Sequence, residues 1–170
     1  MVEFVNPNTM NNAKGEAAVV NRLQELGFVV NKPSVKNQPV YDLSVHLSNS
    51  IARTAYIQVK TRGKNNPAGY RIGSKKGVER LADWLKAEKP KSYFFVMVDF
   101  YKGGSIHVLP VKIFIDEVMG WAKHYLSQPK RDGTPRKDTG AWTFEPKWST
   151  KAYEEARENW NAITSYLEGN

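Results

Sequence analysis

Two neighbouring segments of this chain alternate between polar and apolar side chains, and this pattern constrains the fold most. In residues 40–47 every second side chain is polar, beginning at Asp42, and the intervening ones are apolar. Residues 53–60 repeat the pattern, with Gln58 and Lys60 on the polar side. A period of two is that of a β-strand with one covered face. We therefore predict two adjacent strands that bring a carboxylate, an amide oxygen and an ammonium group onto one surface.

The rest of the chain divides into helical and extended segments. Helices are predicted at 12–26, with Asn11 or Asn12 as its cap, at 77–88, at 112–126, and from Ser149 or Thr150 to about 167. Strands are predicted at 28–32, 40–47, 53–60, 92–100 and 105–111. The order αβββαββα predicts an α/β fold with one mixed sheet between helices.

Length and composition agree with one globular domain. The 170 residues are 41% hydrophobic, and the chain contains no cysteine, which excludes disulfides and cysteine nucleophiles. No segment approaches the length of a membrane span, and the first ten residues lack the apolar run of a secretory signal. We expect a single domain over residues 1–170, located in the cytoplasm, with no membrane partner.

Basic residues gather in two stretches. The net charge is +8, and six cations without one acid lie between residues 60 and 76, in a segment that we predict to be a mobile loop. A second basic stretch covers residues 123–137. Basic clusters with a nearby aromatic ring are typical of surfaces that follow phosphates, although a soluble linker is the alternative. The predicted nucleic-acid contacts are Arg62, Lys64, Tyr70, Arg71, Lys75, Lys76, Lys130 and Arg131.

The polar face of the two strands has the donor atoms for a hard cation. Mg²⁺ prefers oxygen ligands, and Asp42, Gln58 and the carbonyl of Val59 offer them. Lys60 can orient or deprotonate a water, or counter charge on a phosphate. Asp42 alone supplies one negative charge, so Glu16, on the edge of the apolar stripe of the first helix, is predicted as a second carboxylate ligand. The pattern favours a metal-dependent nuclease, with Mn²⁺ as a substitute for Mg²⁺.

At these positions the chain resembles the PD-(D/E)XK nuclease superfamily, which has the restriction-endonuclease-like fold. Glu16 stands where that family has a helical glutamate, Asp42 where it has its strand aspartate, and residues 58–60 where it has acid-x-lysine. Gln58 replaces the acid, as in some members, and the proline lies three residues before Asp42. The resemblance covers a core of about residues 12–110 and leaves 111–170 as an extension. It implies Mg²⁺-dependent cleavage of DNA, often by a homodimer that cuts both strands.

Two other functions fit the same sequence. A module that kept the fold but lost the metal through Gln58 would bind nucleic acid without cutting it. An adaptor in a restriction or phage-defence assembly would use the basic surface to bind acidic protein. The simplest alternative is that Asp42 only begins a strand and that Gln58 and Lys60 are ordinary solvent-facing residues of it.

Overall fold

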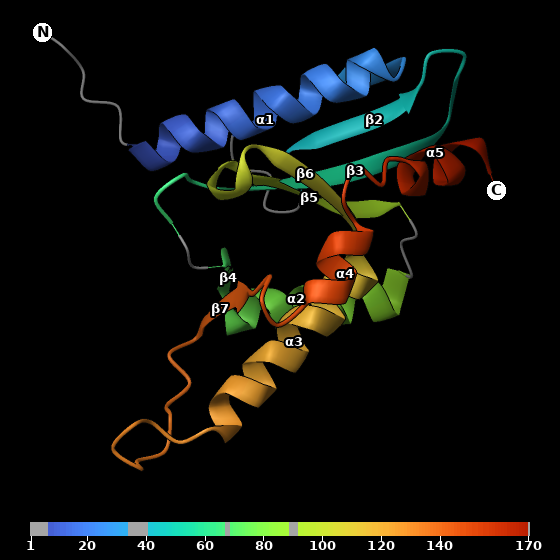
Figure 1. The fold of residues 1–170 in the computed structure, drawn as a ribbon. Coiled ribbons are helices and arrows are strands. Elements are labelled where there is room, and N and C mark those ends of the chain that lie inside the picture. The colour runs from blue at the N-terminus through green and yellow to red at the C-terminus, as the bar shows by residue number, and fades with distance from the viewer. Residues whose placement is uncertain (1–6, 34–40, 67–68, 89–91, 170) are drawn as a thin grey trace, which may run out of the picture.

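The computed structural model describes residues 7–33, 41–66, 69–88 and 92–169. Its centre is a five-stranded sheet in the order β1-β2-β3-β5-β6 (Figure 1). The strands of this sheet are β1 Phe28–Asn31, β2 Leu43–Leu47, β3 Ser50–Arg62, β5 Tyr93–Asp99 and β6 Ser105–Pro110. Neighbouring strands run antiparallel except β3 and β5, which run parallel. The predicted mixed sheet between helices is therefore confirmed.

The long strand β3 and the central strand β5 explain why the sheet is mixed. All seven residues of β5 are buried, as expected of a strand covered on both faces. Because β3 and β5 are parallel, the chain must cross over between them, and it does so through β4 (Tyr70–Ser74) and helix α2 (Lys75–Glu88). This arrangement places the C-terminal ends of β3 and β5 side by side at the same end of the sheet.

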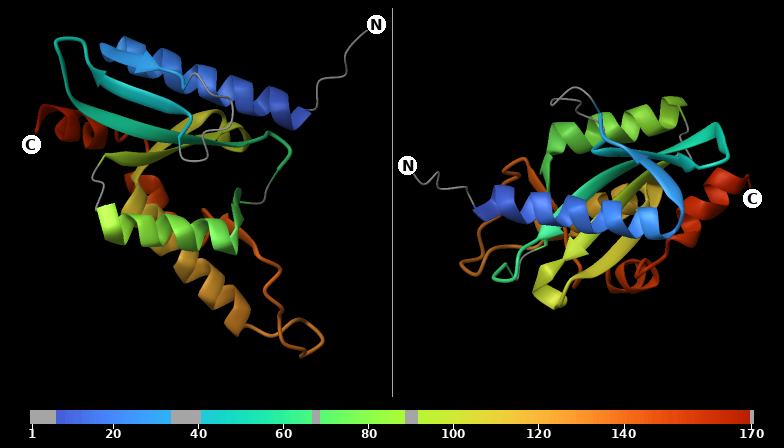
Figure 2. Two further views of the ribbon diagram at one scale, coloured as in Figure 1. Left: turned by 180° about the vertical axis from the view of Figure 1, so that it is seen from behind. Right: turned by 90° about the horizontal axis from the view of Figure 1, so that it is seen from above.

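Helix α1 (Pro7–Glu25) lies on one face of the sheet, together with α5 (Asn161–Glu168) (Figures 1 and 2). Val19 and Leu23 of α1 are fully buried and pack with the apolar residues of β2 and β3. A Cβ atom at Gly15 would come within 2.1 Å of the Thr61 side chain, so α1 rests on the end of β3 at this point.

Helices α2 and α3 (Val111–Ser127) cover the opposite face. The core there is aromatic: the Phe114 ring stacks on Phe95 at 3.7 Å and on Phe144 at 5.3 Å between centroids. Phe144 belongs to β7 (Ala141–Phe144), which pairs with β4 in a separate two-stranded sheet. Helix α4 (Thr150–Glu155) adds Tyr153 to the same layer.

Several predicted boundaries are wrong. Helix α1 begins at Pro7, so Asn11 and Asn12 lie inside it and do not cap it. Residues 61–76 are not one loop, because they include the end of β3, all of β4 and the start of α2. The strand β4 is stabilised by pairing with β7, about seventy residues further along the chain, which local propensity does not reveal.

The last predicted helix is in fact two helices. α4 ends at Glu155 and α5 begins at Asn161, and Glu158 between them has a positive φ of 49°. The backbone N–H groups of Glu158 and Trp160 bond to Ile106 and Glu158, outside any helical ladder. This break turns the chain from the α2–α3 face of the sheet to the α1 face. The part of the predicted strand 40–47 before residue 41 lies outside the described residues.

Candidate active site

Asp42 and Gln58 face each other across the antiparallel pair of β2 and β3. The register sets Leu43 opposite Ile57, which places Asp42, just before β2, opposite Gln58. The Gln58 Nε2 atom donates a hydrogen bond of 2.6 Å to Oδ2 of Asp42, and the backbone N–H of Val59 donates one of 2.7 Å to the same oxygen. Because the β2 ladder begins at Leu43, the Val59 N–H finds its acceptor in the Asp42 carboxylate. The two residues are thus brought together as predicted.

Tyr93 of β5 lies on the other side of Gln58. Its hydroxyl donates a hydrogen bond of 3.4 Å to Oε1 of Gln58. Burial raises the pKa of Tyr93, and the nearby Asp42 carboxylate raises it further, so the hydroxyl stays protonated as a donor. The amide of Gln58 is therefore held from both sides, by an acceptor at Nε2 and by a donor at Oε1. The Tyr93 contact could not be predicted from the sequence, because it depends on the parallel pairing of β3 with β5.

Lys60 follows Gln58 on the same face of β3. Its neighbour across the parallel pair is Met97, which belongs to the core between the sheet and α2–α3. Burial lowers the pKa of Lys60 below the usual lysine value, and the negative charge of Asp42 opposes this shift. Only the neutral amine of a lysine can accept a proton, and a lowered pKa increases the neutral fraction near neutral pH. Asp42, Gln58 and Lys60 are therefore assembled on one side of the sheet.

Glu16 occupies a different position from the other three residues. Its helix packs on the opposite face of the sheet, and its carboxylate lies 3.5 Å from the Lys32 ammonium group in an ion pair. Lys32 follows β1, whose last residue, Asn31, lies opposite Ser44. Glu16 thus lies near the end of the sheet at which Asp42 precedes β2. Its role as a metal ligand stays a prediction, and no group of three His, Asp or Glu suited to a metal occurs among the described residues.

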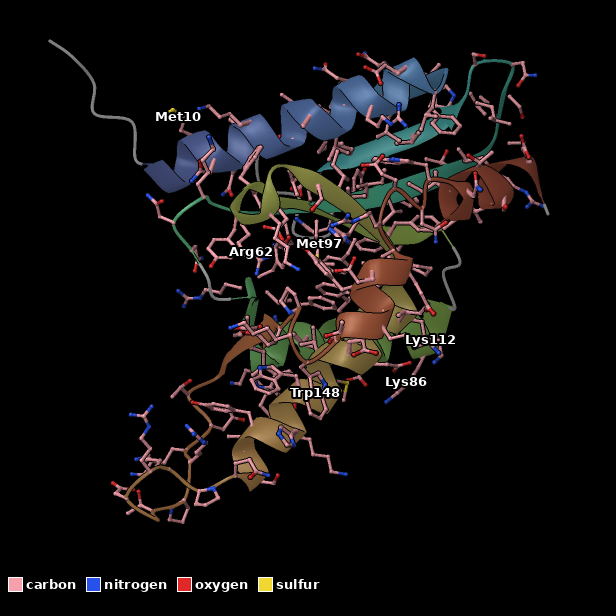
Figure 3. The ribbon with its side chains drawn as sticks, in the orientation of Figure 1. Met10, Arg62, Lys86, Met97, Lys112 and Trp148 are labelled. Carbon is pink, nitrogen blue, oxygen red and sulfur yellow. The ribbon has the colours of Figure 1, made fainter. Side chains whose placement is uncertain are left out.

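Arg62 and Tyr70 require a correction. Both were predicted to contact nucleic acid, but the structure buries them, with 3% and 1% of their surfaces exposed. The Arg62 guanidinium points into the layer between the sheet and α2–α3 (Figure 3), where it forms a two-pronged ion pair with Asp99, and its Nε donates a 2.9 Å hydrogen bond to Oδ1. Part of the signal for this pair was in the sequence, and the strand register in the structure supplies the rest. A carboxylate that ends an apolar strand needs a buried partner, and the register sets Arg62 opposite Asp99.

A chain of hydrogen bonds connects this ion pair to the C-terminal extension. The Tyr153 hydroxyl of α4 donates a 2.6 Å bond to Oδ2 of Asp99 and lies 3.0 Å from the Tyr70 hydroxyl. The carbonyl of Tyr153 lies 2.7 Å from Nδ1 of His107, whose ring stacks on the Tyr153 ring. Burial lowers the pKa of His107, so its ring is neutral at neutral pH. The extension is therefore bonded to the end of the strand that carries Lys60.

The other predicted nucleic-acid contacts lie nearer the surface. Five of them are exposed. Lys64 lies in the loop after β3, Arg71 in β4, Lys76 in α2, and Lys130 and Arg131 in the loop after α3. Lys75 is engaged within the protein, since its ammonium group lies 3.1 Å from Asp138. Nucleic-acid binding by these residues stays a prediction. Lys75 would have to leave Asp138 in order to bind a phosphate.

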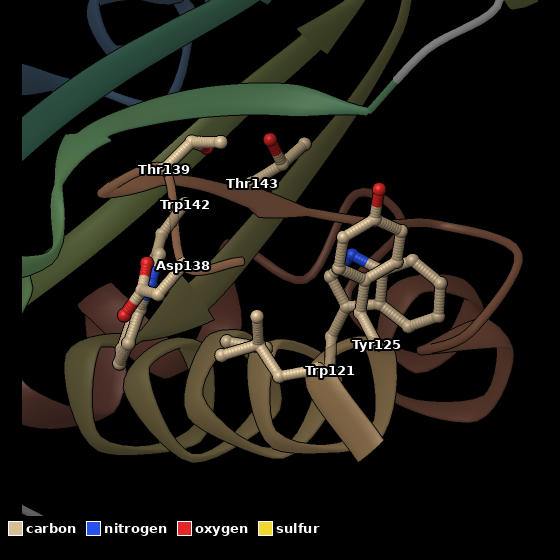
Figure 4. A pocket seen from close by; sticks show the side chains of 8 residues that line it. Trp121, Tyr125, Asp138, Thr139, Trp142 and Thr143 are labelled. Atoms are coloured by element: carbon tan, nitrogen blue, oxygen red, sulfur yellow. The ribbon is translucent and has the colours of Figure 1, made fainter. Parts of the chain in front are cut away.

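A small pocket lies between α3 and the segment before β7, away from these residues (Figure 4). Trp121 and Tyr125 of α3 face Asp138 and Trp142 across it. Its volume of about 50 Å³ admits water but is far below the size of a nucleotide-binding cavity. The pocket is therefore a packing feature of the extension.

Comparison with solved structures identifies the fold. The chain is similar to a bacterial homing endonuclease, I-Ssp6803I, with a TM-score of 0.54 and 16% identity over 95% of this chain and 96% of that one. It is also similar to the Holliday junction resolvase Hjc of Archaeoglobus fulgidus, with a TM-score of 0.51 and 12% identity over 90% of this chain and 95% of that one. The sequence matches no protein-family model and no curated protein.

The architecture is thus the restriction-endonuclease-like fold, as predicted. The similarity covers nearly the whole chain, including the extension after residue 110. Among the described residues, no helix is long and apolar enough to cross a membrane.

Proposed function

We propose that this protein is a Mg²⁺-dependent DNA endonuclease. The observation that carries the proposal is the joint placement of Asp42, Gln58 and Lys60 on one face of β2 and β3, with a lowered pKa at Lys60. The resemblance of the sequence to the PD-(D/E)XK pattern at these three positions supports the proposal. The two solved structures reported above are named as a homing endonuclease and a Holliday junction resolvase.

The donor atoms present fit a magnesium ion. Mg²⁺ keeps several waters and needs one or two carboxylates, with the phosphate of the substrate completing its shell. Asp42 would supply the carboxylate, Gln58 and the Val59 carbonyl neutral oxygens, and Glu16 a second carboxylate. Gln58 now turns its Nε2 toward Asp42, so its amide would have to rotate to offer Oε1 to an ion held by Asp42. When bound, the ion would lower the pKa of a water and offset charge on the phosphate.

The protein's own groups would do the remaining work. Lys60 would take a proton from the attacking water or counter the charge that develops on the phosphate. Tyr93 would hold the rotated Gln58 amide in place by accepting a hydrogen bond from its Nε2, in place of the bond that it now donates to Oε1. The basic surface, with a net charge of +8 for the whole chain, would hold the DNA backbone. A homodimer would place two such sites on the two strands of a duplex, and a cytoplasmic location accords with DNA as substrate.

Cleavage assays on purified variants test this proposal. Asp42→Ala and Lys60→Ala should each reduce cleavage of plasmid DNA and synthetic junctions in Mg²⁺ or Mn²⁺ by at least about a hundredfold. Asp116→Asn and Lys112→Ala are matched controls, because this pair forms an exposed ion pair of 2.7 Å within α3. Wild-type rates in both site variants, or full cleavage in EDTA, would reject the assignment.

A nucleic-acid-binding module without catalysis is the second candidate. It is favoured by one observation: the described sheet site has a single carboxylate, because Gln58 stands where a second acid would double the charge. Calorimetric titration with Mn²⁺ separates the two candidates. An endonuclease should bind the ion in a way that Asp42→Ala removes, whereas an inert module should show DNA binding and no such site. An adaptor for acidic protein would bind no DNA even at low salt.

A further inference from the structure

A wide polar groove lies at the end of the sheet where β3 and β5 finish. The start of α1, the loop that follows β3 and the turn that follows β5 lie together at this end of the molecule (Figure 1). They enclose a groove of about 970 Å³. The residues that concern its chemistry are Asn11, Asn12, Lys14, Lys64, Asn65 and Asn66. At this volume the groove is as large as the biggest ligand sites of ordinary proteins.

Close packing fixes the walls of the groove relative to each other. Gly15 of α1 lies against Thr61 of β3, where a Cβ atom would clash at 2.1 Å. Just beyond the strand, a Cβ atom at Gly63 would lie 2.8 Å from the side-chain nitrogen of Asn11. Helix and strand therefore touch at two successive points, and the groove lies beside this seam. A preformed groove of this kind costs little ordering when a ligand enters it.

The chemistry of the groove suits an anion that also carries hydrogen-bonding groups. Its amide side chains can both donate and accept hydrogen bonds, and its two lysines are cationic. None of the described residues that line it is acidic. No ion pair is found for Lys14 or Lys64 among the described residues, whereas Lys86 and Lys112 have acidic neighbours at 3.5 and 2.7 Å. Among the residues that the structure describes, no acidic side chain therefore competes for the two groove lysines.

The groove begins one residue further along the strand that carries Lys60, on the other face of the sheet. Thr61, which lines the groove, follows Lys60 in β3, but the two side chains lie on opposite faces of the sheet. A ligand that contacts both must pass the end of β3, where Lys64 and Asn65 are exposed. Amides beside lysines match a polynucleotide, whose phosphates attract the lysines and whose sugars and base edges pair with amides.

From this placement we propose that the groove binds the stretch of nucleic acid that leads away from the scissile phosphate. This inference rests on the proposed function, and it assigns binding roles to Asn11, Asn12, Lys14 and Asn65. The groove holds the flanking strand by its phosphates through Lys14 and Lys64, and the asparagines bond to the nucleotides between them. Binding then depends on how far the substrate extends beyond the cleavage site on that side.

Binding in EDTA tests the groove without requiring catalysis. The probes are fluorescent DNA duplexes and single strands of increasing length, measured by anisotropy from 50 to 200 mM salt. The double variant Lys14→Ala/Lys64→Ala should bind the long probes about tenfold more weakly and flatten the salt slope by about two, one for each lost phosphate contact. It should also bind long and short probes more equally than the wild type does.

The matched control removes two lysines elsewhere. Lys86→Ala/Lys112→Ala changes the net charge equally at residues that lie far from the start of α1 (Figure 3). Asn12→Asp and Asn65→Asp add a negative charge inside the groove at almost constant size, with Asn161→Asp at the exposed start of α5 as their control. Only the groove variants should lose affinity.

Equal losses in the groove and control variants, or no loss in either, would overturn the groove proposal. The proposal would also fail if the wild-type protein bound neither DNA nor RNA at 50 mM salt. It would fail as well if polyglutamate displaced the probe as effectively as unlabelled DNA does. The proposed endonuclease activity fails separately. Groove-dependent binding without cleavage in Mg²⁺ would reject the endonuclease activity and support the groove proposal. Cleavage by the wild type, together with unchanged DNA binding by the groove variants, would support the endonuclease activity and reject the groove proposal.

Discussion

Arg62 and Asp99 form a buried ion pair at the end of the strand that carries Lys60. Burial alone would raise the pKa of Asp99, but the hydrogen bonds from Arg62 and Tyr153 outweigh it and leave the pKa below its usual value. Both groups therefore remain charged, and each neutralises the other beside Lys60. The pair fixes the end of β3 to the end of β5, and Tyr153 extends this attachment to α4. The geometry around Lys60 thus depends on residues outside the motif.

Breaking this pair should destabilise the protein strongly. Asp99→Asn leaves the Arg62 cation buried without its counter-charge, at a cost of roughly 3–5 kcal/mol in the free energy of unfolding. Tyr153→Phe removes one hydrogen bond to the carboxylate and should cost roughly 1–3 kcal/mol. Urea unfolding at pH 7 measures both. Since the folded-state pKa of Asp99 is lowered, the wild type should lose this stability as the pH falls through that pKa, and Asp99→Asn should not.

Replacing Lys60 by methionine should have opposite effects on stability and activity. The partly buried ammonium group opposes folding, so Lys60→Met should raise the free energy of unfolding at pH 7 by roughly 0.5–2 kcal/mol while it abolishes cleavage. The lowered pKa means that the folded state releases this proton before the unfolded state does as the pH rises. Wild-type stability should therefore rise relative to Lys60→Met between the lowered pKa and the usual lysine value.

Chemical denaturation at several pH values between 7 and 10.5 follows this difference. Lys64→Met is the control, because Lys64 is exposed just beyond the same strand. A Lys60→Met variant that is less stable than the wild type at pH 7 would show that the ammonium group is compensated in the folded protein.

Gln58→Glu should make the fold depend on a divalent cation. The new carboxylate would replace an amide that lies 2.6 Å from Asp42, and two like charges at this distance repel each other. In EDTA the melting temperature should fall by several degrees, about 1 kcal/mol in a domain of this size corresponding to roughly 2–4 °C. Mn²⁺ should restore it, because a ligand that binds only the folded state stabilises that state. Gln58→Ala should show neither response.

Thermal melts with and without Mn²⁺ measure this effect, and cleavage assays show whether the second acid reduces the metal concentration required. If Mn²⁺ raises the melting temperature of Gln58→Glu no more than that of Gln58→Ala, then the two strands do not form a metal site.

Glu16→Gln tests the predicted second carboxylate. The Glu16–Lys32 ion pair is exposed, with 33% and 61% of the side-chain surfaces accessible, so its loss should change the free energy of unfolding by less than about 1 kcal/mol. If Glu16 is a ligand, the Mg²⁺ concentration for half-maximal cleavage should rise about tenfold or more. Glu25→Gln, which removes an exposed carboxylate further along α1, is the control. An unchanged Mg²⁺ requirement would limit the ligands to the sheet.

The core of the candidate site was predictable because it depends on local periodicity. Asp42, Gln58 and Lys60 lie on two strands joined by a short turn, and a period of two fixes which side chains share a face. The prediction for Arg62 was wrong because the strand was predicted to end at residue 60 and Arg62 was assigned to a basic loop, whereas β3 continues through Arg62. Local periodicity does not show where this strand ends. It cannot tell that α2 and α3 cover this part of the strand, and the charge is therefore matched by Asp99 inside the protein instead of facing solvent.

The sequence alone determined the order of α1, α2 and the five strands of the central sheet, the strands that carry the motif, and the basic character of the chain. These properties depend on propensity, hydrophobic period and composition, which are local. Only the tertiary structure decided the pairing of β4 with β7, the division of the last helix, the burial of Arg62 and Tyr70, and the groove beside α1. Each of these brings together residues that are distant in the chain, and their energies come from contacts that no local pattern encodes.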